Sequence, residues 1–115
     1  MAEFVEVART EELPSGTMKA MVVAGREILL ARVGDKFYAA AKLCPHMKGD
    51  LSRGQLEGSV VTCPRHGSRF DLTTGRVVRW LGGGVLSKVG TAFKMSRDLV
   101  VYNVKVQDGK VLVEL

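Results

Sequence analysis

The chain has 115 residues, of which 46% are hydrophobic and 25% charged, as expected for one folded domain. No apolar stretch approaches the roughly eighteen residues of a membrane-spanning helix. The first residues also lack the basic-then-apolar order of a signal peptide. We therefore expect a single domain over residues 1–115, located in the cytoplasm and without a membrane anchor.

The formal net charge of +5 is unevenly distributed along the chain. Residues 42–79 contain seven basic and three acidic side chains, so this segment holds a net charge of +4. Such an excess can attract an acidic partner or nucleic acid, or can be an ordinary solvated face. No basic helix or aromatic reading motif accompanies the charge, which disfavours nucleic acid.

The predicted secondary structure consists of short strands. In chain order they fall near residues 4–7, 18–24, 27–33, 36–41, 60–62, 70–72, 77–80, 99–106 and 111–115. Gly25-Arg26 fits a two-residue hairpin turn, and Asp108-Gly109 fits another. The three glycines of residues 82–84 predict an irregular segment. No stretch has a persuasive helical period, so the sequence indicates an all-β fold, an antiparallel sandwich or barrel.

Two short motifs contain every cysteine and every histidine of the chain. Cys44-Pro45-His46 and Cys63-Pro64-Arg65-His66 are separated by sixteen residues, and each includes a proline typical of a turn. Two thiolates and two imidazoles make a complete set of four metal ligands. We therefore predict a metal centre held by Cys44, His46, Cys63 and His66.

Three uses of these ligands are open. Zinc accepts two cysteines and two histidines, but its familiar motifs pair Cys with Cys and His with His. A disulfide between the two cysteines would be a weak staple for a domain of this size and is opposed by a reducing compartment. A binuclear iron–sulfur cluster fits the mixed pairs, with both sulfurs on one iron and both imidazoles on the other.

The arrangement resembles the Rieske-type ferredoxins. The two motifs, followed by Gly67, by Phe70-Asp71 and by Thr74-Gly75, match that family's signature in order, and the flanking segments resemble its β scaffold. The resemblance implies a Rieske-like antiparallel β-sandwich with a small cluster-binding subdomain at about residues 42–82. It also implies a [2Fe-2S] cluster with Cys44 and Cys63 on one iron and His46 and His66 on the other.

Departures from the family pattern indicate to which branch of the family the chain is most similar. Respiratory Rieske subunits carry a bracing disulfide whose cysteines would fall at Gly49 and Arg65, and neither residue is cysteine here. Large oxygenase subunits need further histidines for a second iron site, and this chain has none left. Ser68 stands where relatives place a hydroxyl that donates to a bridging sulfide, whereas Phe70 replaces a tyrosine donor.

The resemblance therefore implies a one-electron carrier that has no catalytic residues of its own. Its expected partners are redox proteins, namely a reductase as donor and an oxygenase or other oxidoreductase as acceptor, with an acidic docking face on the partner. No nucleic acid or membrane is expected. The alternatives are a small Rieske subunit of a multi-subunit oxidoreductase, similar to nitrite reductase or an oxygenase complex, and a structural zinc domain.

Overall fold

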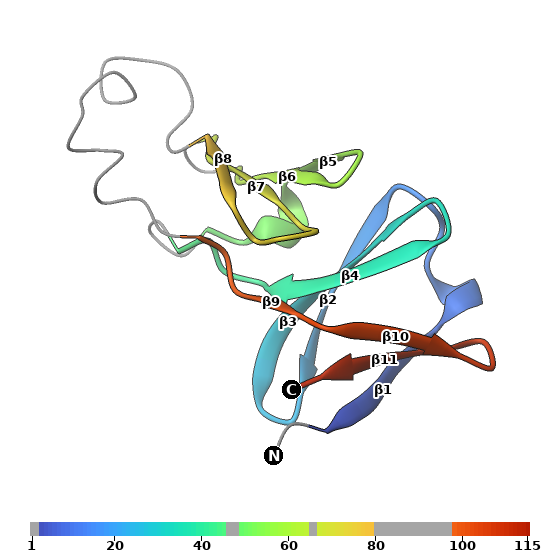
Figure 1. Ribbon diagram of the computed structural model, residues 1–115. Helices are drawn as coiled ribbons and strands as arrows, with labels where there is room; N and C mark the ends of the chain where they lie inside the picture. Colours follow the sequence, from blue (N-terminus) through green and yellow to red (C-terminus); the bar gives the residue numbers. More distant parts are fainter. Residues whose placement is uncertain (1–2, 46–48, 65–66, 80–97) are drawn as a thin grey trace, which may run out of the picture.

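The computed structural model describes residues 3–45, 49–64, 67–79 and 98–115 (Figure 1). Its elements are β1 (Phe4–Arg9), η1 (Thr10–Glu12), β2 (Thr17–Val23), β3 (Arg26–Val33), β4 (Lys36–Ala41), η2 (Leu51–Arg53), β5 (Gln55–Glu57), β6 (Val60–Thr62), β7 (Arg69–Asp71), β8 (Val77–Arg79), β9 (Val101–Tyr102), β10 (Val104–Gln107) and β11 (Lys110–Glu114), where η marks a 3-10 turn. Every strand pairing in this part of the chain is antiparallel. The expected all-β antiparallel fold is confirmed.

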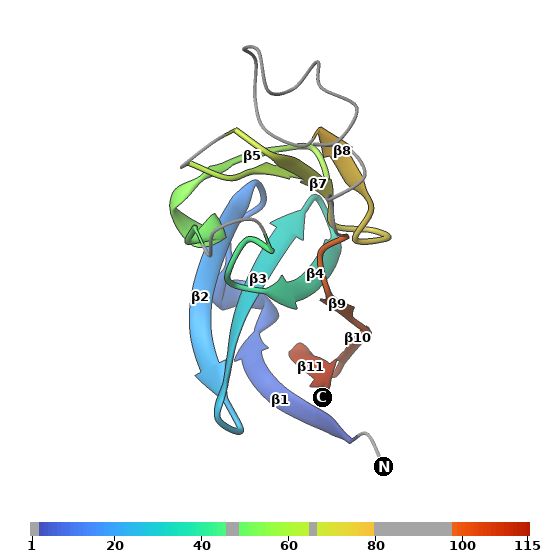
Figure 2. The same ribbon diagram turned by 90° about the vertical axis from the view of Figure 1, so that its left-hand side faces the viewer.

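The strands form three sheets. Their orders are β1-β11-β10, β2-β3-β4-β9 and β5-β6-β7-β8. We call the second the middle sheet and the third the small sheet. Figures 1 and 2 both show the middle sheet between the small sheet on one side and the β1-β11-β10 sheet on the other.

The middle sheet is apolar on both faces because it separates two hydrophobic cores. Successive side chains of a strand point to opposite faces. On β3, Leu29 and Ala31 accordingly enter one core while Ile28 and Leu30 enter the other. The first core also contains both cysteines and the buried residues of the small sheet. This double burial explains why residues 28–31 form a continuous apolar run instead of alternating with polar residues.

The turn between β2 and β3 corrects the sequence prediction by one residue. Val23 pairs with Arg26, so the turn residues are Ala24 and Gly25 and not Gly25-Arg26. Ala24 has φ 52° and Gly25 has φ 79°, and a two-residue turn with both φ values positive matches the twist of a hairpin. The packing of β3 sets this register, because a shift by one residue would exchange its two faces.

Two further elements differ from expectation. The strand predicted over residues 99–106 is divided at Asn103 into β9, which pairs with β4, and β10, which pairs with β11. Strand β5 and the two 3-10 turns were not predicted at all. The glycines of residues 82–84 lie outside the described residues. Within the described part, no helix is both long enough and apolar enough to cross a membrane.

Candidate metal centre

Each cysteine begins a loop that is closed in the same way. The Cys44 N–H donates to the Gly49 carbonyl at 2.8 Å, and the Cys63 N–H donates to the Ser68 carbonyl at 2.8 Å. In both cases the acceptor lies five residues after the cysteine. We call residues 44–49 the first loop and residues 63–68 the second loop.

The backbone residue pairs that flank the two loops are also equivalent. Leu43 is bridged to Asp50 around the first loop, and Thr62 pairs with Arg69 around the second. The first loop follows β4 of the middle sheet, whereas the second connects β6 and β7 of the small sheet. The two cysteines are thus presented by two different layers of the fold in matching backbone settings.

The cysteines are buried thiols. Cys44 is 1% exposed and Cys63 is 2% exposed, and no disulfide joins them. Both belong to one apolar core, which also contains Leu51, Val61 and Phe70. Because the sulfurs face the protein interior, ligands from these thiols would hold the inner side of a metal centre. The competing disulfide interpretation is not supported.

Of the four predicted ligands, the structure describes Cys44 and Cys63. His46 and His66 lie outside the described residues, and by sequence each falls within one of the two closed loops. No group of three or more His, Cys, Asp or Glu side chains that could hold a metal ion occurs in the described ranges. The set of four ligands is therefore taken up below as a proposal.

A close backbone contact fixes the two loops relative to each other. Gly54, which follows η2, packs so tightly against Thr62 that a Cβ at position 54 would lie 1.8 Å from the Thr62 carbonyl oxygen. Thr62 directly precedes Cys63, and η2 begins two residues after Gly49, which closes the first loop. Only glycine permits this approach, a requirement that the sequence prediction missed because an isolated Gly in a loop carries no specific signal.

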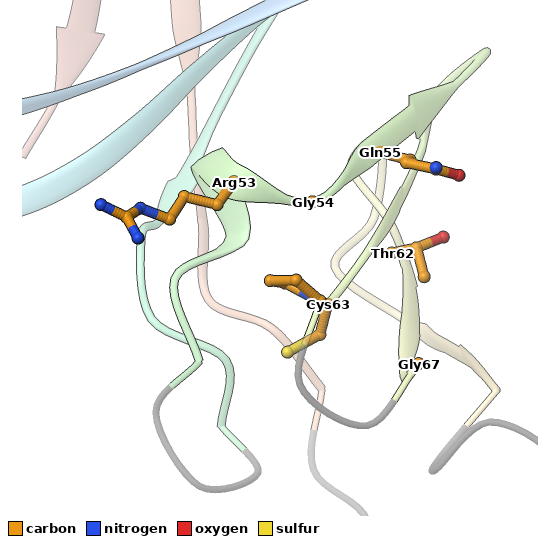
Figure 3. A pocket seen from close by; sticks show the side chains of 7 residues that line it. Arg53, Gly54, Gln55, Thr62, Cys63 and Gly67 are labelled. Atoms are coloured by element: carbon orange, nitrogen blue, oxygen red, sulfur yellow. The ribbon is translucent and has the colours of Figure 1, made fainter.

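A pocket of about 430 Å³ opens beside the second loop. It is lined by Arg53, Gly54, Gln55, Thr62, Cys63, Pro64 and Gly67. Figure 3 shows the Cys63 sulfur at the centre of this group, with the Gln55 and Arg53 side chains extending away from it in opposite directions. Gly67 has φ 75°, a left-handed conformation that favours glycine, and its N–H donates to the Cys63 carbonyl at 3.1 Å.

Asp50 organises the return of the first loop. Its Oδ1 accepts hydrogen bonds from the Ser52 N–H at 3.0 Å and the Ser52 hydroxyl at 2.6 Å, which caps η2. Burial by itself raises the pKa of Asp50, but the hydrogen bonds from Ser52 and the positive charges of Lys42 and Arg53 outweigh it. The net pKa lies below its usual value, so Asp50 is a carboxylate at neutral pH.

Asp71 plays a similar part at the far end of the small sheet. Its Oδ1 accepts from the Thr73 hydroxyl at 2.7 Å, from the Thr73 N–H at 2.9 Å and from the Ser59 hydroxyl at 3.4 Å. The bonds from Thr73 are the main reason that the pKa of Asp71 is lowered, and the bond from Ser59 adds to them against an opposing effect of burial. The carboxylate joins the turn after β7 to the turn before β6.

Ser68 and Phe70, the two residues expected to influence the potential, are both fully buried. Ser68 is the one buried polar side chain in the described part of the chain. Its position at the end of the second loop, two residues before Phe70 on β7, keeps both beside the buried cysteines. The predicted hydrogen bond from the Ser68 hydroxyl to a bridging sulfide stays a prediction.

The basic side chains near the loops are less available than their number suggests. Lys42 Nζ lies 3.2 Å from Glu27 Oε1, and Arg69 Nη2 lies 3.0 Å from Glu57 Oε1. These two cations of the basic segment form ion pairs that attach the loops to β3 and β5. Lys48 and Arg65, which also belong to the basic segment, lie outside the described residues.

Comparison with known proteins identifies the family. Residues 3–84 match the family model described as the Rieske [2Fe-2S] domain. A relative from Ralstonia sp., the ferredoxin component of naphthalene 1,2-dioxygenase/salicylate 5-hydroxylase systems, is 29% identical and covers 97% of this chain and 95% of its own. A ferredoxin component of a naphthalene 1,2-dioxygenase system from Pseudomonas aeruginosa is 28% identical, with 98% and 96% covered.

The solved structures agree with the sequences. The ferredoxin of carbazole 1,9a-dioxygenase from Nocardioides aromaticivorans IC177 superposes with a TM-score of 0.78 at 30% identity, over 96% of this chain and 95% of the other. A complex of reduced oxygenase and oxidized ferredoxin in carbazole 1,9a-dioxygenase contains a chain with a TM-score of 0.77 at 30% identity, with 96% and 91% covered.

The described residues fit an iron–sulfur cluster. Two buried thiols stand in matched loops, a left-handed glycine follows the second cysteine by four residues, and a pocket reaches Cys63. When bound, a Rieske cluster accepts and donates one electron. The chain belongs to the Rieske [2Fe-2S] domain family, and it is an electron carrier with a [2Fe-2S] cluster as its cofactor.

Proposed function

We propose that this chain is the ferredoxin of an oxygenase system and delivers single electrons to the oxygenase component. The observation that carries the proposal is the length of the match, because relatives named as ferredoxin components align with 97% or more of this chain and 95% or more of their own. The chain thus aligns with nearly the whole length of these carrier proteins. The same comparison disfavours a small Rieske subunit of a permanent complex.

We further propose Cys44, Cys63, His46 and His66 as the ligands of the cluster. The buried thiols are suited to the inner iron, because a thiolate needs shielding from solvent and oxidants. Neutral imidazoles in place of two thiolates make the cluster less negative, which favours its reduction. The equal closure of the two loops supports this division, since each loop contributes one sulfur and one imidazole.

The physiological location proposed for the carrier is the cytoplasm. A reducing compartment would keep both thiols available to bind the cluster. Its donor would be a reductase and its acceptor an oxygenase, as the relatives' designation as components of dioxygenase systems suggests. One electron passes per encounter, so the cluster is oxidised as the acceptor centre is reduced.

The test combines analysis of the cofactor with a measurement of electron transfer. Purified protein should contain two iron and two sulfide per chain, because the cluster is binuclear. The reduced protein should then reduce the terminal oxygenase of the Nocardioides aromaticivorans carbazole 1,9a-dioxygenase in stopped-flow absorption. The Cys63→Ala variant, which lacks one proposed ligand, should neither hold iron nor transfer electrons.

Each part of the proposal has a result that would contradict it. Normal iron content in Cys63→Ala would overturn the ligand assignment. A wild-type chain that holds the cluster but leaves the oxygenase oxidised would overturn the proposed acceptor. Elution of the isolated chain as an unfolded or aggregated species on size-exclusion chromatography would instead favour a permanent subunit that needs its large partner.

A further inference from the structure

Arg53 differs from the other described cations beside the two loops. The Lys42 side chain is 20% exposed and contacts Glu27, and the Arg69 side chain is 34% exposed and contacts Glu57 and the Thr62 hydroxyl. The Arg53 side chain is 83% exposed. Lys42 and Arg69 therefore serve the fold, whereas the Arg53 guanidinium projects into solvent.

The one carboxylate near Arg53 in the described structure does not satisfy it. Asp50 Oδ2 lies 4.0 Å from Arg53 Nε, at the outer limit of an ion pair. Asp50 already accepts two hydrogen bonds from Ser52 and lies 4.0 Å from Lys42 Nζ. Among the described residues, no acceptor is placed against the two terminal nitrogens of Arg53, so the planar fork is available to an external carboxylate.

The backbone beneath this side chain is held firmly. The Arg53 N–H donates to the Asp50 carbonyl at 3.1 Å, and the Gly54 N–H donates to the Leu51 carbonyl at 3.0 Å. The contact between Gly54 and Thr62 joins this segment to the strand that leads into Cys63. Arg53 is therefore an exposed charged side chain on a hydrogen-bonded backbone, adjacent to both cysteine loops. Figure 3 shows it extending away from Cys63 and Gln55.

We infer that Arg53 is an anchor that binds a carboxylate on the docking face of the acceptor protein and so orients the cluster end of the carrier toward it. The inference rests on the proposed function and adds the residue and the partner chemistry. Arginine binds carboxylates through two parallel hydrogen bonds, which fixes orientation as well as proximity. Arg53 also contributes to the net charge of +4 in residues 42–79, which favours a partner with an acidic surface.

Arg76 provides a matched control. It is also exposed, and no ion pair of its side chain occurs in the described structure. It lies in the turn between β7 and β8, beyond Asp71, whereas the second loop is at the opposite end of β7 next to Arg69. Arg53→Glu and Arg76→Glu change the net charge of the molecule equally, so they differ only in where the charge is reversed.

The experiment measures the second-order rate of reduction of the Nocardioides aromaticivorans oxygenase by each reduced variant. At low salt we expect Arg53→Glu to lower the rate by about tenfold or more, and Arg76→Glu to lower it by no more than about twofold. Arg53→Gln should lie between wild type and Arg53→Glu. The difference should shrink as salt rises, because the screening length falls from about 10 Å at 0.1 M to about 3 Å at 1 M.

Two readouts keep the interpretation clear. The visible spectrum of Arg53→Glu should match that of Arg76→Glu, since neither substitution changes a proposed ligand. The midpoint potential of Arg53→Glu should be no higher than that of wild type, because an added negative charge disfavours the reduced cluster, so slower transfer would not result from a weaker driving force. Equal rates for the two variants, with wild type active, would overturn the anchor and leave the proposed function standing. An inactive wild type would overturn the proposed acceptor itself.

Discussion

Replacing Gly54 by alanine tests whether the backbone contact between the two loops maintains the metal centre. The conformation of Gly54, φ −82° and ψ −161°, is extended and is allowed for alanine. Its added Cβ would nevertheless lie 1.8 Å from the Thr62 carbonyl oxygen and 3.0 Å from the Thr62 carbonyl carbon. The cost is therefore steric, and it falls on the residue that precedes Cys63.

The magnitude follows from how far the two segments must separate. A Cβ–oxygen contact below 3.0 Å is essentially never seen, so Gly54 and Thr62 must move apart by about 1 Å. Both are backbone segments held by hydrogen bonds, and neither can turn aside as a flexible side chain would. We expect a loss of about 1–3 kcal/mol, the range for inserting a methyl group into a tightly packed site. For a chain of 115 residues, each kcal/mol lowers the melting temperature by about 4 °C, between the values for smaller and larger domains.

The assay follows two signals during heating, the visible absorption of the cluster and the far-UV circular dichroism of the strands. In Gly54→Ala the visible signal should disappear several degrees before the strands melt, because the displacement acts on the loop that begins at Cys63. The control is Gly58→Ala in the turn between β5 and β6. Gly58 has φ +57°, and a Cβ added there would have no atom within 4 Å. This variant should therefore lower the melting temperature of both signals equally, through backbone strain alone. If Gly54→Ala is as stable as wild type, or loses both signals together as the control does, the contact does not secure the centre.

Other predictions address the ligands, the potential and the acid response. Changing Cys63 to Ala should abolish the reduced Rieske EPR signal, whereas a retained signal would contradict its role. Ser68→Ala should lower the midpoint potential and Phe70→Tyr should raise it, because a hydroxyl donor favours the more negative reduced cluster. If voltammetry shows no shift in Ser68→Ala, Ser68 is only a turn residue. The lowered pKa values of Asp50 and Asp71 contribute stability that is present above their usual pKa of 3.8 and is lost as pH falls through the folded-state values. The urea midpoint, followed by circular dichroism, should thus fall below about pH 4, and Asp71→Asn should weaken that fall.

The family and its cofactor could be predicted because the chemistry is concentrated in two short motifs. The spacing of Cys44 and Cys63 with their histidines indicated the iron–sulfur family, which the comparisons confirm. The sequence also indicated most strands, since runs such as residues 28–31 are long and apolar. Burial of both cysteines in one core agrees with their expected place on the inner side of a cluster.

The features that were missed depend on contacts between distant segments. Strand β5 is three residues long and mostly polar, so its pairing with β6 gives it a strand conformation that its own composition does not favour. The contact of Gly54 with Thr62 is likewise invisible in either segment alone. The ion pairs of Lys42 and Arg69 were also missed, because their partners, Glu27 and Glu57, are fifteen and twelve residues away. A charge count records the cations but not what they contact.

The two cysteine loops belong to different layers of the molecule, and each is held to its own layer by an ion pair. The first loop is attached to the middle sheet through the ion pair between Lys42 and Glu27, and the second to the small sheet through Arg69 and Glu57. A cluster bound by Cys44 and Cys63 would therefore join two layers that must not shift relative to each other as the charge of the cluster changes. The backbone contact at Gly54, just before β5, holds the segment that leads away from the first loop against β6 without any titratable group. The same segment carries the exposed Arg53, so a partner that binds its guanidinium would meet the cluster end in one orientation.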